Sequence, residues 1–341
     1  LYRLGGDEFA LVSCDLSVEQ ALARATVIRE NISQPYQVYD ALINIDACIG
    51  IVISDRETRT DYLYKCADLA LYEAKKEGAG TVQIFRPGML QRLQENKSFE
   101  DDLLQALDNG EFRVYYQPIA DTMSGEIYGY EALVRWFHPV RGMVPPTIFI
   151  PVAEKIGMIN PLGEWVLKTA CEEAASWSSP LKVSVNVSPV QLINSSLTDT
   201  VISVLKHTGL DPRRLDLEIT ESDVFNENTR SLEILSQLRE LGIQISIDDF
   251  GTGYSSLSRL SYFPFDKIKI DRSFVINIPA QKDDLDIVRL IISMGKSLHM
   301  RIVAEGVETD EQLKSLQQLG CDLVQGYLIG KPGPLNTASN K

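Results

Sequence analysis

Two neighbouring aspartates, Asp248 and Asp249, follow an apolar run in the segment ISIDDFGTG at 245–253. Adjacent carboxylates repel each other and resist burial unless a cation or a shared proton compensates their charge. The pair therefore predicts a metal site, two carboxyl groups that share a proton, or an exposed turn. Consecutive side chains of a strand point to opposite faces, so the two aspartates can act together only if the strand ends at them. We expect such a strand end here.

Polar side chains also end most of the other apolar runs in the second half of the chain. Taken singly, each of them is more often a helix cap or an exposed loop side chain than a member of a site. Five carboxylates, an amide and a lysine from this set would converge at one place, and the carboxylates would repel one another strongly there without cations. Oxygen ligands without histidine or thiolate suit Mg²⁺ or Mn²⁺. Besides the aspartate pair, the set comprises Gln117, Glu131, Arg135, Asn186, Glu218, Glu221, Lys269, Asp271, Glu305 and Gln325.

These carboxylates are numerous enough to hold two divalent ions, with one aspartate shared between them. Two metals roughly 3.5–4 Å apart activate a water and steady the leaving oxygen of a phosphodiester. Lys269 would orient that water or neutralise developing charge, and Arg135 suits a bidentate phosphate contact. The residues therefore predict metal-dependent phosphodiester chemistry.

The apolar runs from residue 110 onward alternate with amphipathic helical stretches. Eight strand–helix units in about 230 residues are typical of a (β/α)₈ barrel, in which the active site lies at the carboxyl ends of the strands. The first two runs have no helix between them, so we expect an irregular start. An open doubly wound sheet would carry a Gly-rich phosphate loop after its first strand, and no such motif occurs. The predicted strands lie within 112–118, 127–136, 182–189, 214–222, 244–251, 266–273, 301–308 and 322–330.

The residues before this barrel predict a smaller α+β domain at 1–87. Its pattern is a strand–turn–strand, a helix at 17–33, an alternating apolar run at 43–53, a helix at 62–78 and a strand at 81–85. Apolar residues at helical spacing then predict a linking helix over 88–109. The barrel follows at 110–335, and 336–341 form a tail.

Composition narrows the class of protein. A formal charge of −14 argues against binding a DNA or RNA polymer, which needs a basic surface. Three histidines do not suit a histidine-rich zinc centre, and five scattered cysteines fit reduced thiols in the cytoplasm. No stretch reaches the roughly 18 apolar residues of a membrane span. We expect this region to be cytoplasmic, with any membrane anchor of a full-length protein upstream of it.

Seven motifs in order resemble the EAL family of cyclic di-GMP phosphodiesterases. They are EALVRW (131–136), NVS (186–188), EITES (218–222), DDFGTGYSSL (248–257), KIDRSF (269–274), AEGVE (304–308) and QGY (325–327). The resemblance implies a modified barrel with one antiparallel strand. It also implies hydrolysis of cyclic di-GMP to linear pGpG in bacterial second-messenger signalling, with Mg²⁺ or Mn²⁺ as cofactor. The alternative is a receptor that binds cyclic di-GMP without cutting it.

The same resemblance assigns roles to individual residues. Lys269 matches the lysine that orients the attacking water, Gln325 a water or site contact, and Glu221 the glutamate that holds the DDFGTG loop. Glu305 completes the network of metals and lysine. At Ile329 the family often has an aromatic residue, so stacking on a guanine would be weaker here. The implied metal ligands are Glu131, Asn186, Glu218, Asp248 as the bridge, Asp249 and Glu305; the implied substrate contacts are Gln117, Leu133, Arg135 and Asp271.

The first segment resembles the later part of a GGDEF diguanylate cyclase domain. RLGGDEF at 3–9 places Asp7 and Glu8 on the signature turn, and ADLALYEAKKEG at 67–78 matches a later helix. A phosphate-binding arginine of that family is replaced by Ala79, four residues after Lys75. We therefore expect no cyclase activity from this chain and favour a regulatory or dimer-coupling domain. The resemblance also implies a homodimer. One alternative is that the full-length GGDEF domain binds GTP and activates the barrel through the linking helix; the other is that residues 89–109 are an inert spacer.

Overall fold

A computed structural model describes residues 1–54, 58–193, 196–221, 229–252, 263 and 265–335 of the protein. The tail predicted at 336–341, Ser222 of EITES and all of GYSSL (253–257) in the aspartate motif lie outside the described residues. Two compact units, Leu1–Asp101 and Asp102–Lys341, are considered separately. Within the described ranges, no helix combines the length and apolar character needed to cross a bilayer.

The described residues of the first unit form short strands and helices, and its last helix continues into the second unit. Ser17 and Gln20 form a capping box at the start of its first helix, as expected from a serine three residues before a glutamine. Its elements are β1 (Tyr2–Gly5), β2 (Glu8–Ala10), α1 (Val18–Ile32), β3 (Tyr36–Val38), β4 (Ala41–Ile43), β5 (Ile49–Ile51), α2 (Thr60–Glu77) and β6 (Val82–Ile84).

The alternating run at 43–53 is not one strand, contrary to the simplest interpretation of its pattern. It contains the end of β4, an irregular segment and β5, which pairs in parallel with β6. Asp46 interrupts the run because its carboxylate accepts hydrogen bonds from the Ala47 amide at 2.8 Å and the Ser33 hydroxyl at 2.9 Å. A local side-chain bond of this kind competes with the pairing of a strand.

The helix predicted over 88–109 is α3 (Pro87–Ala106). Proline suits its first turn, where the missing N–H would have no helical partner. The boundary between the two units falls within this helix, and Leu103 and Ala106 near its end are fully buried in the second unit.

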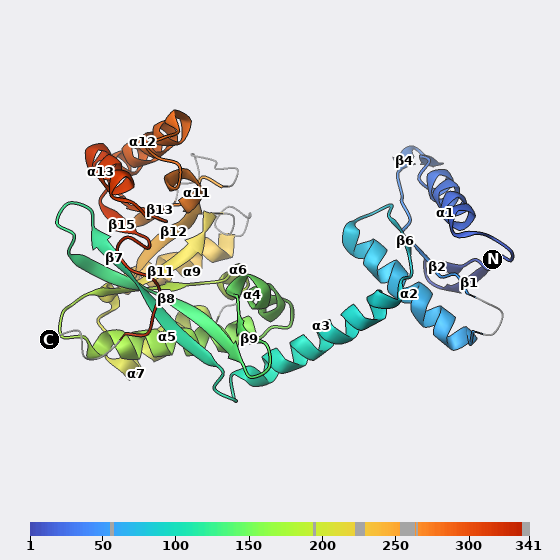
Figure 1. The fold of residues 1–341 in the computed structure, drawn as a ribbon, viewed down its shortest axis with the longest axis horizontal. Coiled ribbons are helices and arrows are strands. Elements are labelled where there is room, and N and C mark those ends of the chain that lie inside the picture. Colours follow the sequence, from blue (N-terminus) through green and yellow to red (C-terminus); the bar gives the residue numbers. More distant parts are fainter. Residues whose placement is uncertain (55–57, 194–195, 222–228, 253–262, 264, 336–341) are drawn as a thin grey trace. The chain divides into compact units, whose positions relative to one another are not determined.

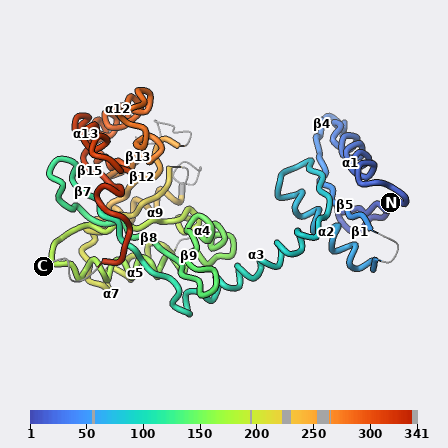
Figure 2. The backbone as a smooth tube through the Cα atoms, in the orientation of Figure 1, coloured from blue at the N-terminus to red at the C-terminus, as the bar shows by residue number. Residues whose placement is uncertain are grey.

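Within the described residues of the second unit, eight strands close into a barrel (Figures 1 and 2). Neighbours run in parallel from β8 to β10 and on through β15, whereas β7 is antiparallel to both β8 and β15. The predicted fold, including one antiparallel strand, is confirmed. The strands are β7 (Phe112–Asp121), β8 (Ile127–His138), β10 (Lys182–Asn186), β11 (Leu215–Thr220), β12 (Gln244–Phe250), β13 (Lys267–Ile270), β14 (Arg301–Ala304) and β15 (Leu323–Gln325).

Helices lie around the outside of this barrel, as Figure 1 shows. A short strand, β9 (Gly142–Val144), which the apolar pattern did not reveal, extends a hairpin with the end of β8. The helices are α4 (Pro146–Lys155), α5 (Ile159–Ser176), α6 (Pro189–Ile193), α7 (Leu197–Thr208), η1 (Pro212–Arg214), α9 (Thr229–Glu240), α11 (Arg272–Val275), α12 (Lys282–Ser297) and α13 (Asp310–Leu319).

Strand alternation sorts apolar side chains outward and polar ones inward. In β11, Leu215, Leu217 and Ile219 are buried, while Asp216 and Glu218 between them point to the other face. Because helices cover the outer face, the apolar residues form the core between strands and helices. The residues that β11 turns into the barrel are therefore the polar ones, Asp216 and Glu218.

The aspartate pair lies within a strand, so the expected strand end was wrong. β12 continues to Phe250, and its pairing with β13 shifts register between Ile247 and Phe250. Asp249 has a φ of +53°, in the left-handed region. A bulge and a left-handed residue rotate the second side chain relative to the strict alternation. The two carboxylates can thus act together without the strand ending.

Two other predicted strand-end residues also lie inside strands. Gln117 is in the middle of β7 because that strand is antiparallel to its neighbours, and Glu131 is in the middle of β8 because β8 runs on to His138. The two residues are paired directly across these strands. Both nevertheless lie at the level where the shorter parallel strands end.

Candidate active site

A single buried lysine lies among four carboxylates at the carboxyl ends of the strands. Lys269 Nζ is 2.6 Å from Glu218 Oε2, 2.7 Å from Glu305 Oε1, 3.1 Å from Asp248 Oδ1 and 3.5 Å from Glu131 Oε2. The five side chains come from five different strands or strand ends, so only closure of the barrel brings them together. Lys269 itself is 1 % exposed.

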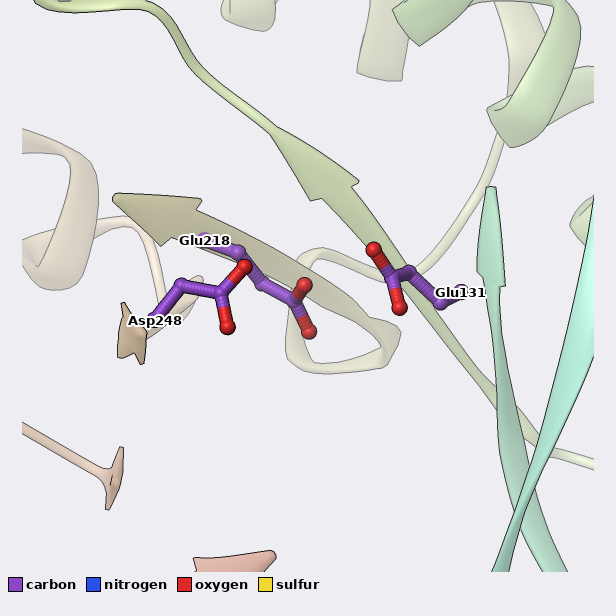
Figure 3. A group of neighbouring side chains, drawn as sticks. All are labelled: Glu131, Glu218 and Asp248. Atoms are coloured by element: carbon purple, nitrogen blue, oxygen red, sulfur yellow. The ribbon is translucent and has the colours of Figure 1, made fainter. Parts of the chain in front are cut away.

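The carboxylates form two groups that share Asp248. Glu131, Glu218 and Asp248 offer oxygens within 4.8 Å of one another, and so do Asp248, Asp249 and Glu305. Figure 3 shows the carboxyl groups of the first group gathered in one region, where Glu131 comes from β8 and Glu218 and Asp248 from the neighbouring strands β11 and β12. Such spacing lets one carboxylate contact ions bound in both groups.

Amide side chains extend the site across β8 and β15. Asn186 Nδ2 donates to Glu131 Oε1 at 2.7 Å, and Gln325 Nε2 donates to Glu131 Oε2 at 2.6 Å. Gln325 Nε2 also lies 3.2 Å from Gln117 Oε1. Gln325 Oε1 is buried without a hydrogen-bond partner among the described residues. A bound water would satisfy such an acceptor.

Burial and mutual repulsion raise the pKa of several of these groups. Loss of hydration and the charge of Asp248 raise the pKa of Glu305 to about 8, although Lys269 works in the opposite direction. The pKa of Glu218 is raised well above its usual value by burial and by neighbouring carboxylates. Partial loss of hydration raises the pKa of Asp249, whose side chain is exposed at the rim of the site, to about 6, and the charge of Asp248 adds to this shift. The site therefore resists holding all of its negative charges at once.

Two members of the site are held in their charged forms. The pKa of Glu131 is lowered because Lys269, Gln325 and Asn186 together outweigh the effect of burial. Burial works to lower the pKa of Lys269, but the surrounding carboxylates raise it well above its usual value. In the metal-free site Lys269 is therefore an ammonium that can donate hydrogen bonds.

The donor set fits divalent cations. Its ligand atoms are carboxylate and amide oxygens, which suit Mg²⁺ and Mn²⁺ better than softer metals. With all five carboxylates ionised, the Lys269 ammonium leaves four negative charges, which is the charge of two divalent ions. The orphaned Gln325 oxygen supplies a place for a water beside them.

The loop after β12 is fastened to the end of β11. Glu221, 2 % exposed, accepts a hydrogen bond from the Gly251 amide through Oε2 at 2.9 Å. Gly251 has a φ of +100°, and a Cβ there would lie 2.8 Å from Phe274 Cε2. The start of the aspartate loop therefore depends on this glycine and on the Glu221 carboxylate.

Among the residues expected to contact substrate, Gln117 lies beside Glu131 and Gln325 at the site. Leu133 and Arg135 follow Glu131 at intervals of two on β8, so they share its face. Arg135 is half-buried and its guanidinium donates to the Val134 carbonyl at 2.9 Å. Asp271 caps α11 by accepting from the Ser273 amide at 3.0 Å, so one of its oxygens is already used.

One buried pair escaped the sequence-based prediction. Asp216 and Lys267 form an ion pair and lie two residues before Glu218 and Lys269 on the same two strands. The alternation in LDLEIT places Asp216 on the same strand face as Glu218, and the alternation in KIKI places Lys267 on the same face as Lys269. This period of two was the signal available in the sequence.

Comparison with known proteins connects this geometry to a family. The EAL domain model matches residues 100–332, and the model described as "Diguanylate cyclase, GGDEF domain" matches 1–81. An uncharacterized signaling protein of Caulobacter vibrioides is 46% identical over 98% of this chain and 42% of its own length. The "Bifunctional diguanylate cyclase/cyclic di-GMP phosphodiesterase MucR" of Pseudomonas aeruginosa is 41% identical over 97% of this chain and 49% of its own length.

A solved structure agrees with these matches. The "PaMucR Phosphodiesterase, c-di-GMP complex" superposes with a TM-score of 0.67 at 43% identity, covering 70% of this chain and 98% of that one. The chain spans less than half the length of the two curated relatives described above.

Proposed function

The chain belongs to the EAL domain family, with part of a GGDEF domain before the barrel, and on this premise we propose that it hydrolyses cyclic di-GMP to linear pGpG. The observation that carries the proposal is the pair of carboxylate groups that share Asp248, with Lys269 buried between their members. A protein that only bound the nucleotide would not need so many uncompensated carboxylates. A cleavage site that holds two cations does need them.

Glu131, Asn186, Glu218 and Asp248 would hold one cation, and Asp248, Asp249 and Glu305 the second. Bound Mg²⁺ or Mn²⁺ would activate a water and stabilise the leaving oxygen of the phosphodiester. Lys269, as an ammonium, would orient the water through a hydrogen bond. Gln325 would accept a hydrogen bond from a water through its unpartnered oxygen.

The reaction consumes one water and breaks one P–O bond. The water oxygen bonds to phosphorus, the ribose oxygen leaves, and a proton reaches that oxygen, so that one end of pGpG is a phosphate monoester. Arg135 would pair with a phosphate of the substrate, and Leu133 would pack against it from the same face of β8. Gln117 and Asp271 are proposed as further substrate contacts.

Incubation of the purified chain with cyclic di-GMP and Mn²⁺ tests this function, with pGpG followed by chromatography. We expect product from the natural chain and from Lys314→Ala, an exposed lysine of α13 that serves as a control. We expect none after chelation of the metal. Nucleotide binding without any product would identify a receptor and refute the enzyme.

A further inference from the structure

A second buried ion pair lies inside the barrel directly below the candidate metal site. Asp216 and Lys267 are 0 % and 1 % exposed, and the Lys267 ammonium contacts Asp216 Oδ2. Their strands, β11 and β13, also carry Glu218 and Lys269 two residues further on. Two residues of strand span about 6.6 Å, so the lower pair lies one side-chain layer beneath the upper one.

The lower pair is fixed by its surroundings. Asp216 accepts hydrogen bonds from the Ser184 hydroxyl at 2.9 Å and the Ser246 hydroxyl at 2.7 Å. The Lys267 ammonium also lies 5.3 Å from the centre of the Tyr128 ring. Apolar side chains around Tyr128, namely Ile119, Val303 and Leu323, fill the rest of this layer. The charged groups of Asp216 and Lys267 therefore find their hydrogen-bond partners inside the protein and do not need water.

Stability alone does not explain a charged pair at this place. Layers of branched apolar side chains usually fill barrels of this kind. Replacing a buried ion pair by apolar residues of similar size is often neutral or stabilising, because burial removes the hydration of both charges. The pair does, however, place a negative and a positive charge within reach of any cation held by Glu218 and Asp248.

We propose that Asp216 and Lys267 are positioning residues for the metal site. They set the net charge of the side-chain layer directly beneath the site, and they hold Glu218 and Lys269 in position on the same two strands. This inference rests on the proposed function only in assuming that the upper carboxylates bind divalent cations. The negative charge of Asp216 attracts those cations, and the positive charge of Lys267 repels them. The two charges nearly cancel while the pair is intact.

The two single substitutions should therefore change metal affinity in opposite directions. Asp216→Asn leaves the Lys267 charge uncompensated and should raise the Kd for Mn²⁺ at least about tenfold. Lys267→Gln leaves the Asp216 charge uncompensated, with its two serine donors, and should lower the Kd by a similar factor. The double variant has no charge in this layer, so its Kd for Mn²⁺ should lie within about threefold of the Kd of the natural chain.

Isothermal titration of the full chain with Mn²⁺ alone measures these constants without any need for turnover. Lys182→Gln is the matched control, because Lys182 lies one layer further down and is partly exposed, so solvent should keep its effect below about twofold. Thermal unfolding of each metal-free variant reports stability separately. Ser246→Ala should lower the unfolding temperature and leave the Kd within about twofold.

The proposal would be overturned if the Kd for Mn²⁺ changed in the same direction in both single variants, or if it changed less than about twofold in them. If Lys267→Gln does not fold, a comparison of Asp216→Asn with Ser246→Ala still tests the proposal. A larger change in Kd for Asp216→Asn supports it, whereas equal changes in the two variants would indicate loss of packing alone and would overturn it. Failure of the natural chain to bind Mn²⁺ would instead refute the metal-dependent function. The two failures are therefore distinguishable.

Discussion

The Lys269 ammonium lies 2.6 Å from Glu218 Oε2, and both side chains are almost fully buried. Three further carboxylates lie within 3.5 Å of the same nitrogen. One positive charge cannot neutralise four negative ones, so the lysine reduces the repulsion in the site without removing it. Divalent cations would complete the charge balance, and the lysine would then be released to bind a water or the substrate.

Replacement of Lys269 should separate catalysis from binding. Lys269→Ala is expected to reduce the rate of cyclic di-GMP hydrolysis at least about a hundredfold, because a preorganised cationic donor to the reacting groups is lost. Mn²⁺ binding should persist or become tighter, because a repelling charge is removed. The comparison is with Lys314→Ala, assayed for product formation and by titration with Mn²⁺. A wild-type rate would show that the lysine has no role in the reaction.

Asp249 allows charge and backbone conformation to be tested separately. Its φ of +53° favours asparagine or glycine over alanine, which pays about 1 kcal/mol in the left-handed region. Asp249→Asn should therefore keep the fold and relieve repulsion from Asp248, yet reduce hydrolysis at least tenfold through loss of a ligand. Asp249→Ala should also lower the free energy of unfolding, measured by denaturant titration.

Equal stability of the asparagine and alanine variants would show that the left-handed backbone at Asp249 is not strained. Full activity of the asparagine variant would show that this carboxylate does not bind an essential cation. The two measurements thus address different properties of the same residue.

The barrel was predictable from the sequence because period-two alternation and helical spacing are local properties. Glu131, Glu218 and Lys269 could be assigned to one mouth because the ends of parallel strands meet there. The position of Gln117 within an antiparallel strand was not predictable from its own segment, since strand direction depends on pairing with β15 across the barrel.

The bulge at Asp249 was hidden for a related reason. Its register shift exists only relative to β13, whose pairing residues lie twenty positions further along the chain. Similarly, the ion pair of Asp216 and Lys267 depends on two strands that flank β12. The alternation in the sequence indicates that Asp216 faces the same way as Glu218 and that Lys267 faces the same way as Lys269. Only the closed barrel brings the charges of Asp216 and Lys267 together.

Glu221 should control the metal site through the aspartate loop. Glu221→Ala removes the acceptor of the Gly251 amide at 2.9 Å, and an unpaired buried N–H costs about 1–3 kcal/mol. We expect weaker binding of Mn²⁺ and about a tenfold loss of hydrolysis, because the position of Asp249 is no longer fixed. Glu221→Gln retains an acceptor oxygen and should recover much of the loss. Equal defects in the two variants would mean that charge matters, and the hydrogen bond to Gly251 does not.

The raised pKa values predict how the stability of the metal-free protein changes with pH. Unfolded glutamate loses its proton near pH 4.5, whereas Glu305 keeps its proton in the folded protein until about pH 8. Between these values the folded state binds more protons than the unfolded state, so the free energy of unfolding should fall as pH rises. Asp249, with a pKa of about 6, adds to this fall between its unfolded value of 3.8 and pH 6.

Thermal unfolding in the presence of a chelator, at pH values from 5 to 8.5, measures this dependence. Glu305→Gln should reduce this slope above pH 6, where Asp249 no longer contributes and Glu218, whose pKa is also raised, still does. The exposed control Glu233→Gln on α9 should leave the slope unchanged. Added Mn²⁺ should remove most of the slope, because bound cations stabilise the ionised carboxylates and so release their protons. A titration at pH 7 in two buffers of different ionisation enthalpy should detect that release, and equal heats in both buffers would contradict the assignment of a protonated Glu305.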